Sequence, residues 1–322
     1  MIATTVTGIA IAATGAIRTA MTVTTMIVTV TAVITAMGTD AIDAVEGKSV
    51  FQHFSKTQAA QGLSSGHMAH VTFSPPYSPA DQVANQLRDR GFAVLQPSDV
   101  ATWLGCDPAE LLALSGGWGD LPPDEFLKDG GRYRHRRHSC FLVEAERYEQ
   151  VPHRAHWQPV EYNALHGGMQ RWFAPMQDST VSQGAWKKLM VSLAQLAQSS
   201  IAHDGAEQRW HIEAHQFRID TSDGIGRPTP EGAHRDGVDL VAVFLVDRQG
   251  VKGGETRIFE ATGPNGQRFT LTEPWSVLLL DDARMIHETT PIQPVVPGGW
   301  RDTLVVTCRV GDFQNAEGTK AD

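Results

Sequence analysis

A histidine and an aspartate one residue apart constrain this chain more than any other feature of its sequence. They lie in His234-Arg235-Asp236-Gly237, between the turn-rich segment 228–233 and the largely apolar run 238–246. Side chains two positions apart on an extended segment point to the same side, so both can reach one metal ion. A second histidine, His287, follows several predicted strands later. We therefore expect a third ligand to reach the same ion from a neighbouring strand.

Two histidines and one carboxylate are a common ligand set for mononuclear non-haem iron(II) in oxygen-activating enzymes, with coordination positions left open. We predict that His234, Asp236 and His287 bind iron(II) and form the catalytic centre. Arg301 opens a later predicted strand, and Thr303 shares its face. A guanidinium fork and a hydroxyl can together hold the far carboxylate of a dicarboxylate co-substrate. The sequence thus predicts a co-substrate site at Arg301 and Thr303.

From residue 210 onward the chain is predicted to form short strands separated by turn residues, with no helix between them. Turn signals at roughly regular spacing indicate an all-β sandwich or barrel. Helices are predicted before this region, and the clearest one, 185–202, has a single apolar face. We expect the N-terminal helices to buttress one face of the β-structure. The predicted strands are 211–220, 238–247, 255–260, 268–271, 276–280 and 303–309.

The composition is that of an ordinary globular protein, with 41% hydrophobic and 20% charged residues. A formal net charge of −9 argues against a general nucleic-acid-binding protein, which would normally carry a basic surface. The three cysteines, Cys106, Cys140 and Cys308, are far apart and have no CxxC spacing. Neither a disulfide framework nor a thiolate metal site is therefore expected, and a cytoplasmic location is favoured.

The first part of the chain has an unusual composition, because Arg18 is the only charged residue in segment 2–37. A membrane span needs about 20 apolar residues, but Thr and Ala make up about half of segment 19–37, so its insertion would be weak. The basic start and strongly apolar centre of a secretory signal are also missing. We interpret residues 1–67 as a low-complexity, disordered extension outside the fold, with no membrane association. Residues 68–322 then form a single catalytic domain.

The basic segment 132–138 is predicted to be extended, with Arg132, Arg134 and Arg136 on one side. Two interpretations of it remain open. It could be a solvated edge strand, since charged side chains discourage pairing at a sheet edge. Alternatively, it could direct one guanidinium into a pocket, where arginine binds a carboxylate through two hydrogen bonds.

Segment 151–173 is rich in polar and aromatic residues but has no clear period. Such a segment forms either the wall of an active site or a long surface loop. Its histidines, His153, His156 and His166, belong to no recognisable metal-ligand motif. We therefore interpret them as structural or exposed.

From about residue 92 to residue 310 the sequence resembles the Fe(II)/2-oxoglutarate-dependent dioxygenases of the bacterial free L-amino-acid hydroxylase type, which include the L-isoleucine dioxygenases. The resemblance implies a double-stranded β-helix core, jelly-roll or cupin-like, with iron bound by the three predicted ligands and 2-oxoglutarate held by Arg301. Related halogenases lack the carboxylate ligand, so the presence of Asp236 indicates hydroxylation. The matching residues are Gly131-Arg132-Tyr133-Arg134, Tyr162-Asn163, Gly167-Gly168, Gln216-Phe217-Arg218, 228–237, Gly253-Gly254, Leu280-Asp281-Asp282, His287, Thr290-Pro291-Ile292 and Arg301-Asp302.

The resemblance further implies an enzyme that hydroxylates an aliphatic carbon of a small free L-amino acid similar to isoleucine, leucine or methionine. It would consume 2-oxoglutarate and O2, release succinate and CO2, and be stimulated by ascorbate. Such a substrate needs a counter-charge for its carboxylate and an acceptor for its ammonium group. The chain could also form a homodimer. Candidate substrate residues are Arg132, Arg134 and Arg218 for the carboxylate and Asn163, Glu231 and Asp239 for the ammonium group.

Two alternatives stay open. The same cofactor chemistry could act on a peptide-bound residue or a secondary metabolite. The fold could also be a cupin-like metal-binding sensor without turnover. Arg301 and Thr303 argue against the sensor, because a sensor has no obvious need to anchor a dicarboxylate.

Overall fold

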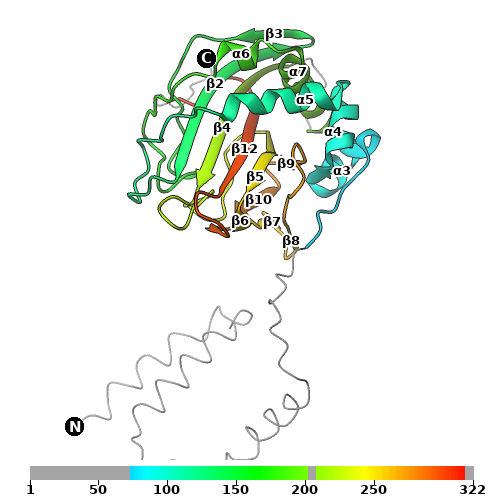
Figure 1. The fold of residues 1–322 in the computed structure, drawn as a ribbon. Coiled ribbons are helices and arrows are strands. Elements are labelled where there is room, and N and C mark those ends of the chain that lie inside the picture. Colours follow the sequence, from blue (N-terminus) through cyan, green and yellow to red (C-terminus); the bar gives the residue numbers. More distant parts are fainter. Residues whose placement is uncertain (1–72, 202–207, 316–322) are drawn as a thin grey trace, which may run out of the picture. The chain divides into compact units, whose positions relative to one another are not determined.

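The structure is a computed structural model that describes residues 73–201 and 208–315. The predicted extension 1–67 lies outside these residues. None of the described helices is long and apolar enough to cross a membrane. Within the described residues, the strands form three antiparallel sheets, and helices cover one face of the largest (Figure 1).

Short helices and one strand open the described part of the chain. The helix α5 begins at a capping box in which Asp107 and Glu110 each accept a hydrogen bond from a backbone N–H group of the first turn, and such boxes satisfy N–H groups left free at a helix start. The helix α3 ends at Gly91, whose φ of 76° suits glycine. These elements are η2 (Ala80–Gln82), α3 (Val83–Arg90), β1 (Phe92–Leu95), α4 (Pro97–Leu104), α5 (Pro108–Ala113) and η3 (Leu114–Trp118). Two helices come later in the chain, α6 (Asp178–Val181) and the longer α7 (Gly184–Ser200).

The large sheet contains seven strands in the order β1-β9-β5-β12-β4-β2-β3. A three-stranded sheet, β10-β7-β8, and a two-stranded sheet, β11-β6, complete the β-structure. This arrangement confirms the predicted jelly-roll core with buttressing helices. The strand bounds are β2 (Arg134–Glu144), β3 (Arg147–Gln150), β4 (Arg209–Asp220), β5 (Leu240–Gln249), β6 (Val251–Gly253), β7 (Thr256–Glu260), β8 (Gly266–Phe269), β9 (Val277–Asp281), β10 (Met285–Thr289), β11 (Ile292–Pro294) and β12 (Trp300–Val310).

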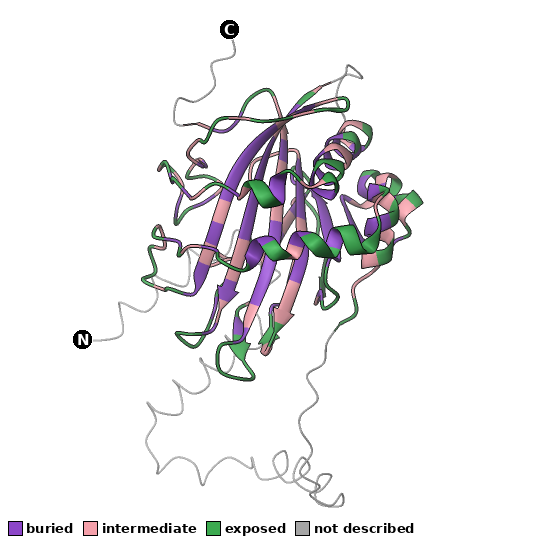
Figure 2. Cartoon of the chain, turned by 45° about the horizontal axis from the view of Figure 1, so that its top comes forward, coloured by how far each residue is buried: buried purple, intermediate pink, exposed green. Residues whose placement is uncertain are grey.

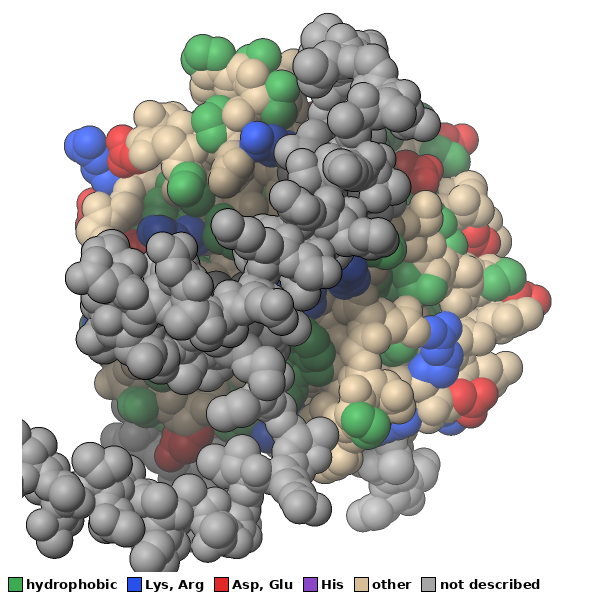
Figure 3. Space-filling view, turned by 90° about the horizontal axis from the view of Figure 1, so that it is seen from below, with side chains coloured by type: hydrophobic (Ala, Val, Ile, Leu, Met, Phe, Trp, Pro, Cys, Tyr) green, Lys and Arg blue, Asp and Glu red, His purple; other side chains and the backbone are tan. Residues whose placement is uncertain are grey.

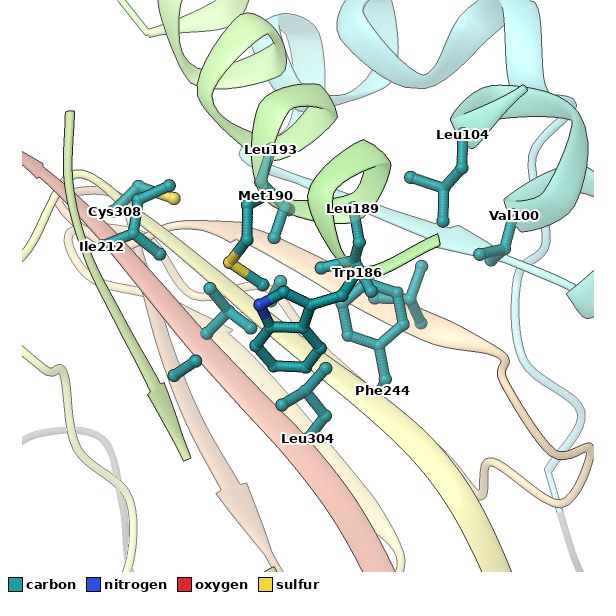
Figure 4. Packing of buried hydrophobic residues seen from close by; sticks show 14 of the residues in the cluster. Val100, Leu104, Trp186, Leu189, Met190, Leu193, Ile212, Phe244, Leu304 and Cys308 are labelled. Atoms are coloured by element: carbon teal, nitrogen blue, oxygen red, sulfur yellow. The ribbon is translucent and has the colours of Figure 1, made fainter. Parts of the chain in front are cut away.

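One face of the large sheet packs against the helices. Trp186 of α7 is fully buried and points onto the sheet beside Phe244 of β5 and Leu304 of β12 (Figure 4). Figure 2 shows that the helices on this face are buried on the side turned toward the sheet and exposed on their outer side. The predicted apolar stripe of segment 185–202 is therefore part of the core, as its period of 3.6 residues indicates.

The opposite face of the large sheet is polar at many positions, although it is largely buried. Strand β12 shows the alternation clearly: Leu304 and Val306 face the helices, whereas Thr303 and Val305 line an internal cavity. Successive side chains on a strand point to opposite faces. Buried apolar residues elsewhere between the sheets, such as Leu245 and Ile258, form a second core cluster beside this cavity.

The outer surface carries charges of both signs. On the face drawn in Figure 3, lysine and arginine side chains lie among aspartate and glutamate side chains and scattered hydrophobic ones. The three cysteines are free.

Candidate active site

His234, Asp236 and His287 form one group, in which a ring nitrogen or a carboxylate oxygen of each residue lies within 4.8 Å of the others. His234 and Asp236 precede β5, and His287 lies in β10. His234 Nε2 is 3.8 Å from Asp236 Oδ1, and His287 Nε2 is 3.8 Å from Asp236 Oδ2. These distances are too long for hydrogen bonds, so the three side chains surround a space that suits an ion.

Backbone hydrogen bonds bring the two histidines together. The N–H of His234 donates to the carbonyl of His287 and the N–H of His287 to the carbonyl of His234, each at 3.0 Å. His234 Nδ1 is 2.9 Å from the carbonyl oxygen of Gly232, which can only accept. The proton therefore lies on Nδ1, and Nε2 keeps the lone pair that a metal ligand needs.

Asp282 holds the segment that carries Asp236. Its carboxylate accepts hydrogen bonds from the backbone N–H groups of Asp236, Gly237 and Val238, at 3.0, 2.7 and 3.1 Å. Burial, and next the neighbouring Asp236 carboxylate, raise the pKa of Asp282 to about 7. Gly237 has a φ of 74°, and a Cβ there would lie 2.4 Å from the Tyr162 ring, so the segment requires glycine at this position.

The charges of the group suit a divalent cation. Burial, and next His234, lower the pKa of His287 well below its ordinary value, so this imidazole is neutral and can donate a lone pair. Burial also acts to lower the pKa of His234, but the carboxylates of Asp236 and Glu231 outweigh it and raise that pKa. Positive charge is therefore stabilised between the three side chains. Two imidazoles and one carboxylate on one side of an ion fit iron(II) with open positions.

Arg301 enters the same cavity from β12. It is buried, and its Nε and Nη2 atoms have no hydrogen-bond partner among the described residues. Burial, and next the positive charge of Arg248, lower the pKa of Arg301 to about 9, so the guanidinium stays charged at neutral pH. An unpartnered buried cation is costly and calls for an anion. Thr303 lines the cavity from the same face of β12.

The rest of the cavity wall is also rich in buried polar groups. Gln158 connects two parts of it, because Arg171 Nη2 donates to Gln158 Oε1 at 3.0 Å and Gln158 Nε2 donates to Asp236 Oδ1 at 3.1 Å. The cavity is lined by Arg134, Arg136, His156, Gln158, Asn163, His166, Arg171, His215, Phe217, Ile219, Pro228, Thr229, Glu231, His234, Asp236, Val243, His287, Thr289, Arg301, Thr303, Val305 and Thr307.

Three of the six predicted substrate residues line this cavity: Arg134, Asn163 and Glu231. Arg134 is buried and pairs with Asp124 at 2.7 Å. Asn163 uses its side-chain amide to bond Gln158 and the backbone N–H of His166. Glu231 has one buried carboxylate oxygen, Oε2, for which the described part of the chain supplies no hydrogen-bond partner.

The other three predicted substrate residues do not line the cavity. Arg132 precedes β2, and its side chain is 85% exposed near Asp223. Arg218 lies on the opposite face of β4 from His215 and forms two hydrogen bonds with Asp302, at 2.8 and 2.7 Å. Asp239 accepts a hydrogen bond from the backbone N–H of Val310. The sequence pattern identifies charged residues of the right kind here, but it does not show which of them face inward.

The interpretation of segment 132–138 as a solvated edge strand is wrong. Strand β2 pairs with β4 along one side. Its other side is covered by the backbone of Pro122 and Asp124. The Arg136 N–H donates to the Pro122 carbonyl, and the Asp124 N–H donates to the Arg134 carbonyl. Arg134 and Arg136 are consequently buried and point inward, as the alternative interpretation expects.

Sequence reasoning missed several residues of the cavity wall: Arg136, His156, Gln158, Arg171 and His215. The sequence predicts that His156 and His166 are structural or exposed; in the structure both are buried and line the cavity. For Arg136 the sequence does contain a signal, because Arg134 and Arg136 are two positions apart on an extended segment and therefore share a face. Segment 151–173 has no period, so nothing in its pattern indicates that His156, Gln158 and Arg171 share one wall.

A jelly-roll core with a partly buried group of two histidines and one carboxylate, and a buried arginine in the same cavity that has no hydrogen-bond partner for two of its nitrogens among the described residues, defines the class of metal-dependent oxygenases that use a dicarboxylate co-substrate. The comparison with known families agrees. Residues 115–307 match the family of the 2OG-Fe dioxygenases, and the chain belongs to this family. It is an Fe(II)- and 2-oxoglutarate-dependent dioxygenase that consumes O2, as predicted from the sequence.

Solved structures extend the comparison. A BsmA homologue from Methylobium petroleophilum PM1 shares 50% sequence identity over 76% of this chain and 99% of its own length, with a TM-score of 0.71. IDO from Bacillus thuringiensis is 19% identical over 72% of this chain and 100% of its own, with a TM-score of 0.59. The Fe(II)/α-ketoglutarate-dependent dioxygenase TqaL is 18% identical over 74% of this chain and 92% of its own, with a TM-score of 0.57. The last two show similarity of fold. No curated protein matches the chain in sequence.

Proposed function

We propose that this enzyme hydroxylates an aliphatic carbon of a small free L-amino acid, similar to isoleucine, leucine or methionine, and releases succinate and CO2. In this proposal His234, Asp236 and His287 bind iron(II), and Arg301 with Thr303 binds the far carboxylate of 2-oxoglutarate. The bound metal and co-substrate supply the oxidising power that breaks an unactivated C–H bond. The protein orients the substrate and excludes water.

The observation that carries the proposal is a set of three buried guanidinium groups in the cavity wall. Arg134 Nη2, Arg136 Nε and Arg171 Nε are each buried, and none has a hydrogen-bond partner among the described residues. A buried donor without a partner costs roughly 1–3 kcal/mol. All three arginines line the cavity, and a carboxylate bound there would meet their positive charge, since arginine pairs with carboxylates through charge-assisted hydrogen bonds.

The balance of charge supports a substrate that also carries an ammonium group. The arginines that line the cavity are Arg134, Arg136, Arg171 and Arg301. The carboxylates that line it, or that form an ion pair with a lining residue, are Asp124, Glu213, Glu231 and Asp236. These opposite charges cancel, and the charges of iron(II) and 2-oxoglutarate cancel as well. A zwitterion leaves the buried site neutral, whereas a substrate with only one charged group does not.

Apolar side chains complete the wall. Phe217, Ile219, Val243 and Val305 line the cavity together with Pro228. Such side chains contact an aliphatic substrate side chain favourably. A peptide-bound residue lacks both α-charges, so it offers no carboxylate to the arginines that line the cavity.

The test is succinate formation by the enzyme with iron(II), ascorbate, 2-oxoglutarate and a panel of free L-amino acids. For an active amino acid we expect its N-acetyl derivative and its amide to stimulate turnover at least about tenfold less, because each loses one charged partner. An Arg171→Gln variant should show a higher KM for the amino acid, and the exposed-site variant Arg132→Gln serves as the matched control. Absence of stimulation by every free amino acid, or equal stimulation by the blocked derivatives, would refute the proposal.

A further inference from the structure

A second group of buried titratable side chains lies in the wall of the same cavity. It consists of His138 on β2, His156 in segment 151–173, and Glu213 and His215 on β4. One side-chain nitrogen or oxygen of each lies within 4.8 Å of the others, and all four residues are buried. Two of them, His156 and His215, line the cavity. The iron-ligand group uses none of them.

The distances identify this group as a hydrogen-bonded network and not as a second metal site. Glu213 Oε2 lies 2.8 Å from both His138 Nε2 and His156 Nδ1. Nitrogen and oxygen ligands about 2.0 Å from a tetrahedral ion would be roughly 3.3 Å apart, so 2.8 Å is a hydrogen-bond distance. His215 Nδ1 is 2.7 Å from the Arg136 guanidinium, and this cation opposes a metal ion beside it.

The network fixes the proton position on His215. A guanidinium can only donate hydrogen bonds, so His215 Nδ1 must accept from Arg136. Burial lowers the pKa of His215 well below its ordinary value, so the ring is neutral and carries its one proton on Nε2. His215 therefore presents Nε2 as a hydrogen-bond donor.

The opposite tautomer is fixed on His156. Burial acts to raise the pKa of Glu213, but its interactions with His156 and His138 outweigh burial and lower it, so the carboxylate is ionised and can only accept. His156 must then donate from Nδ1. Burial lowers the pKa of His156 to about 4, so this ring is also neutral at physiological pH. Its Nε2 atom keeps a lone pair and is a hydrogen-bond acceptor.

These two Nε2 atoms remain free to bind a ligand. Among the described residues neither atom has a hydrogen-bond partner, and neither is among the nitrogens sealed inside the protein. The two rings are neighbours, with centroids 4.6 Å apart. The cavity wall thus offers one acceptor and one donor side by side, next to the guanidinium groups of Arg136 and Arg171, which also line it.

We propose that His156 accepts a hydrogen bond from the ammonium group of the substrate and that His215 donates one to its carboxylate. Glu213 and Arg136 act as positioning residues, because they fix the two tautomers. The α-ammonium and α-carboxylate of one amino acid are adjacent, as the two rings are. This inference rests on the proposed amino-acid substrate and assigns residues that select it.

Paired amide substitutions separate this role from a structural one. The amide of asparagine reaches the position of a histidine Nδ1, whereas the amide of glutamine reaches that of Nε2. In His156→Asn the bond to Glu213 survives and the acceptor in the cavity is lost, and in His156→Gln the reverse holds. We expect His156→Asn to raise the KM for the amino acid at least tenfold above that of His156→Gln. The same order is expected for His215→Asn against His215→Gln.

The affinity for 2-oxoglutarate and the bound iron are measured on the same variants, by anaerobic calorimetry and metal analysis. We expect both to stay within twofold of the parent enzyme, with one iron per chain. A purely structural role predicts the opposite order, since asparagine preserves the network, and that order would overturn the inference. A second bound metal ion that is lost in His156→Asn would also overturn it. If the parent enzyme responds to no amino acid, the proposed function itself fails and this inference falls with it.

Discussion

His234 and His287 are joined by two reciprocal backbone hydrogen bonds of 3.0 Å, in an isolated antiparallel bridge between segments that are far apart in the sequence. The bridge brings the two imidazoles to a centroid distance of 4.6 Å. Their proximity therefore depends on the fold of the backbone and not on the side chain of Asp236, which supplies the carboxylate between them.

Replacing Asp236 should consequently abolish the metal centre without unfolding the protein. For Asp236→Ala we expect iron affinity and amino-acid-dependent turnover to fall by at least about 100-fold, more than the loss typical of residues that only support a ligand. The thermal unfolding midpoint of the metal-free protein should change by only a few degrees, because the His234–His287 bridge remains. Iron analysis, succinate assay and circular dichroism measure these quantities. Full activity of Asp236→Ala would show that the ligand assignment is wrong.

Arg301 is proposed to bind the far carboxylate of 2-oxoglutarate. Its buried Nε and Nη2 atoms lack partners among the described residues, and a charge-assisted hydrogen bond contributes roughly 1.5–3 kcal/mol. We expect Arg301→Gln to raise the KM for 2-oxoglutarate by about 10- to 100-fold. Arg132→Gln, at an exposed arginine outside the cavity, is the control and should leave this KM unchanged. Similar KM values for both variants would refute the assignment.

Asp282 is expected to support the metal centre from outside it. Its carboxylate accepts three backbone N–H groups of the segment that carries Asp236. An amide in its place keeps only one accepting oxygen, so we expect Asp282→Asn to weaken iron binding by about 10- to 100-fold. Asp281→Asn is the neighbouring control, since Asp281 accepts mainly from its own turn. The prediction fails if the two variants bind iron equally well.

The buried histidines should make stability depend on pH. Burial lowers the pKa of His156 to about 4, from an ordinary value of 6.5. Between these values the unfolded chain binds a proton at His156 and the folded protein does not, so the free energy of unfolding decreases as the pH falls from 6.5 toward 4. The slope is about 1.4 kcal/mol per pH unit for each histidine of this kind. Urea denaturation of the metal-free protein at pH 7 and pH 5.5 measures the difference in the free energy of unfolding between these two pH values. The His156→Gln variant should show a smaller difference. An unchanged difference would contradict the assigned pKa.

The grouping of the three proposed metal ligands could be predicted from the sequence because it follows a local rule. The alternation of side chains on a strand gives His234 and Asp236 a common side, and the turn and strand pattern leads to a second ligand segment at His287. The same alternation predicted that Arg134 and Arg136 share a face. It could not show that the edge of β2 is covered by residues 122–124, since that contact joins separate segments.

The substrate side of the cavity could not be predicted in the same way. His156, Gln158 and Arg171 lie in a segment without a period, and their orientation depends on long-range contacts such as Gln158 with Asp236. Arg218 has the charge expected of a carboxylate-binding residue. However, its side chain lies on the face of β4 that is opposite to His215 and therefore outside the cavity. There it forms an ion pair with Asp302, which neutralises its charge. Neither fact is visible in the sequence alone.

The central claim is that this cavity hydroxylates a free amino acid at an iron centre. Mass spectrometry of reactions with iron(II), 2-oxoglutarate and each amino acid of the panel tests it most directly. The account predicts that at least one aliphatic L-amino acid gains a single oxygen atom, with one succinate formed per product, and that Asp236→Ala forms no such product. Succinate formation without an oxygenated amino acid across the whole panel would contradict it.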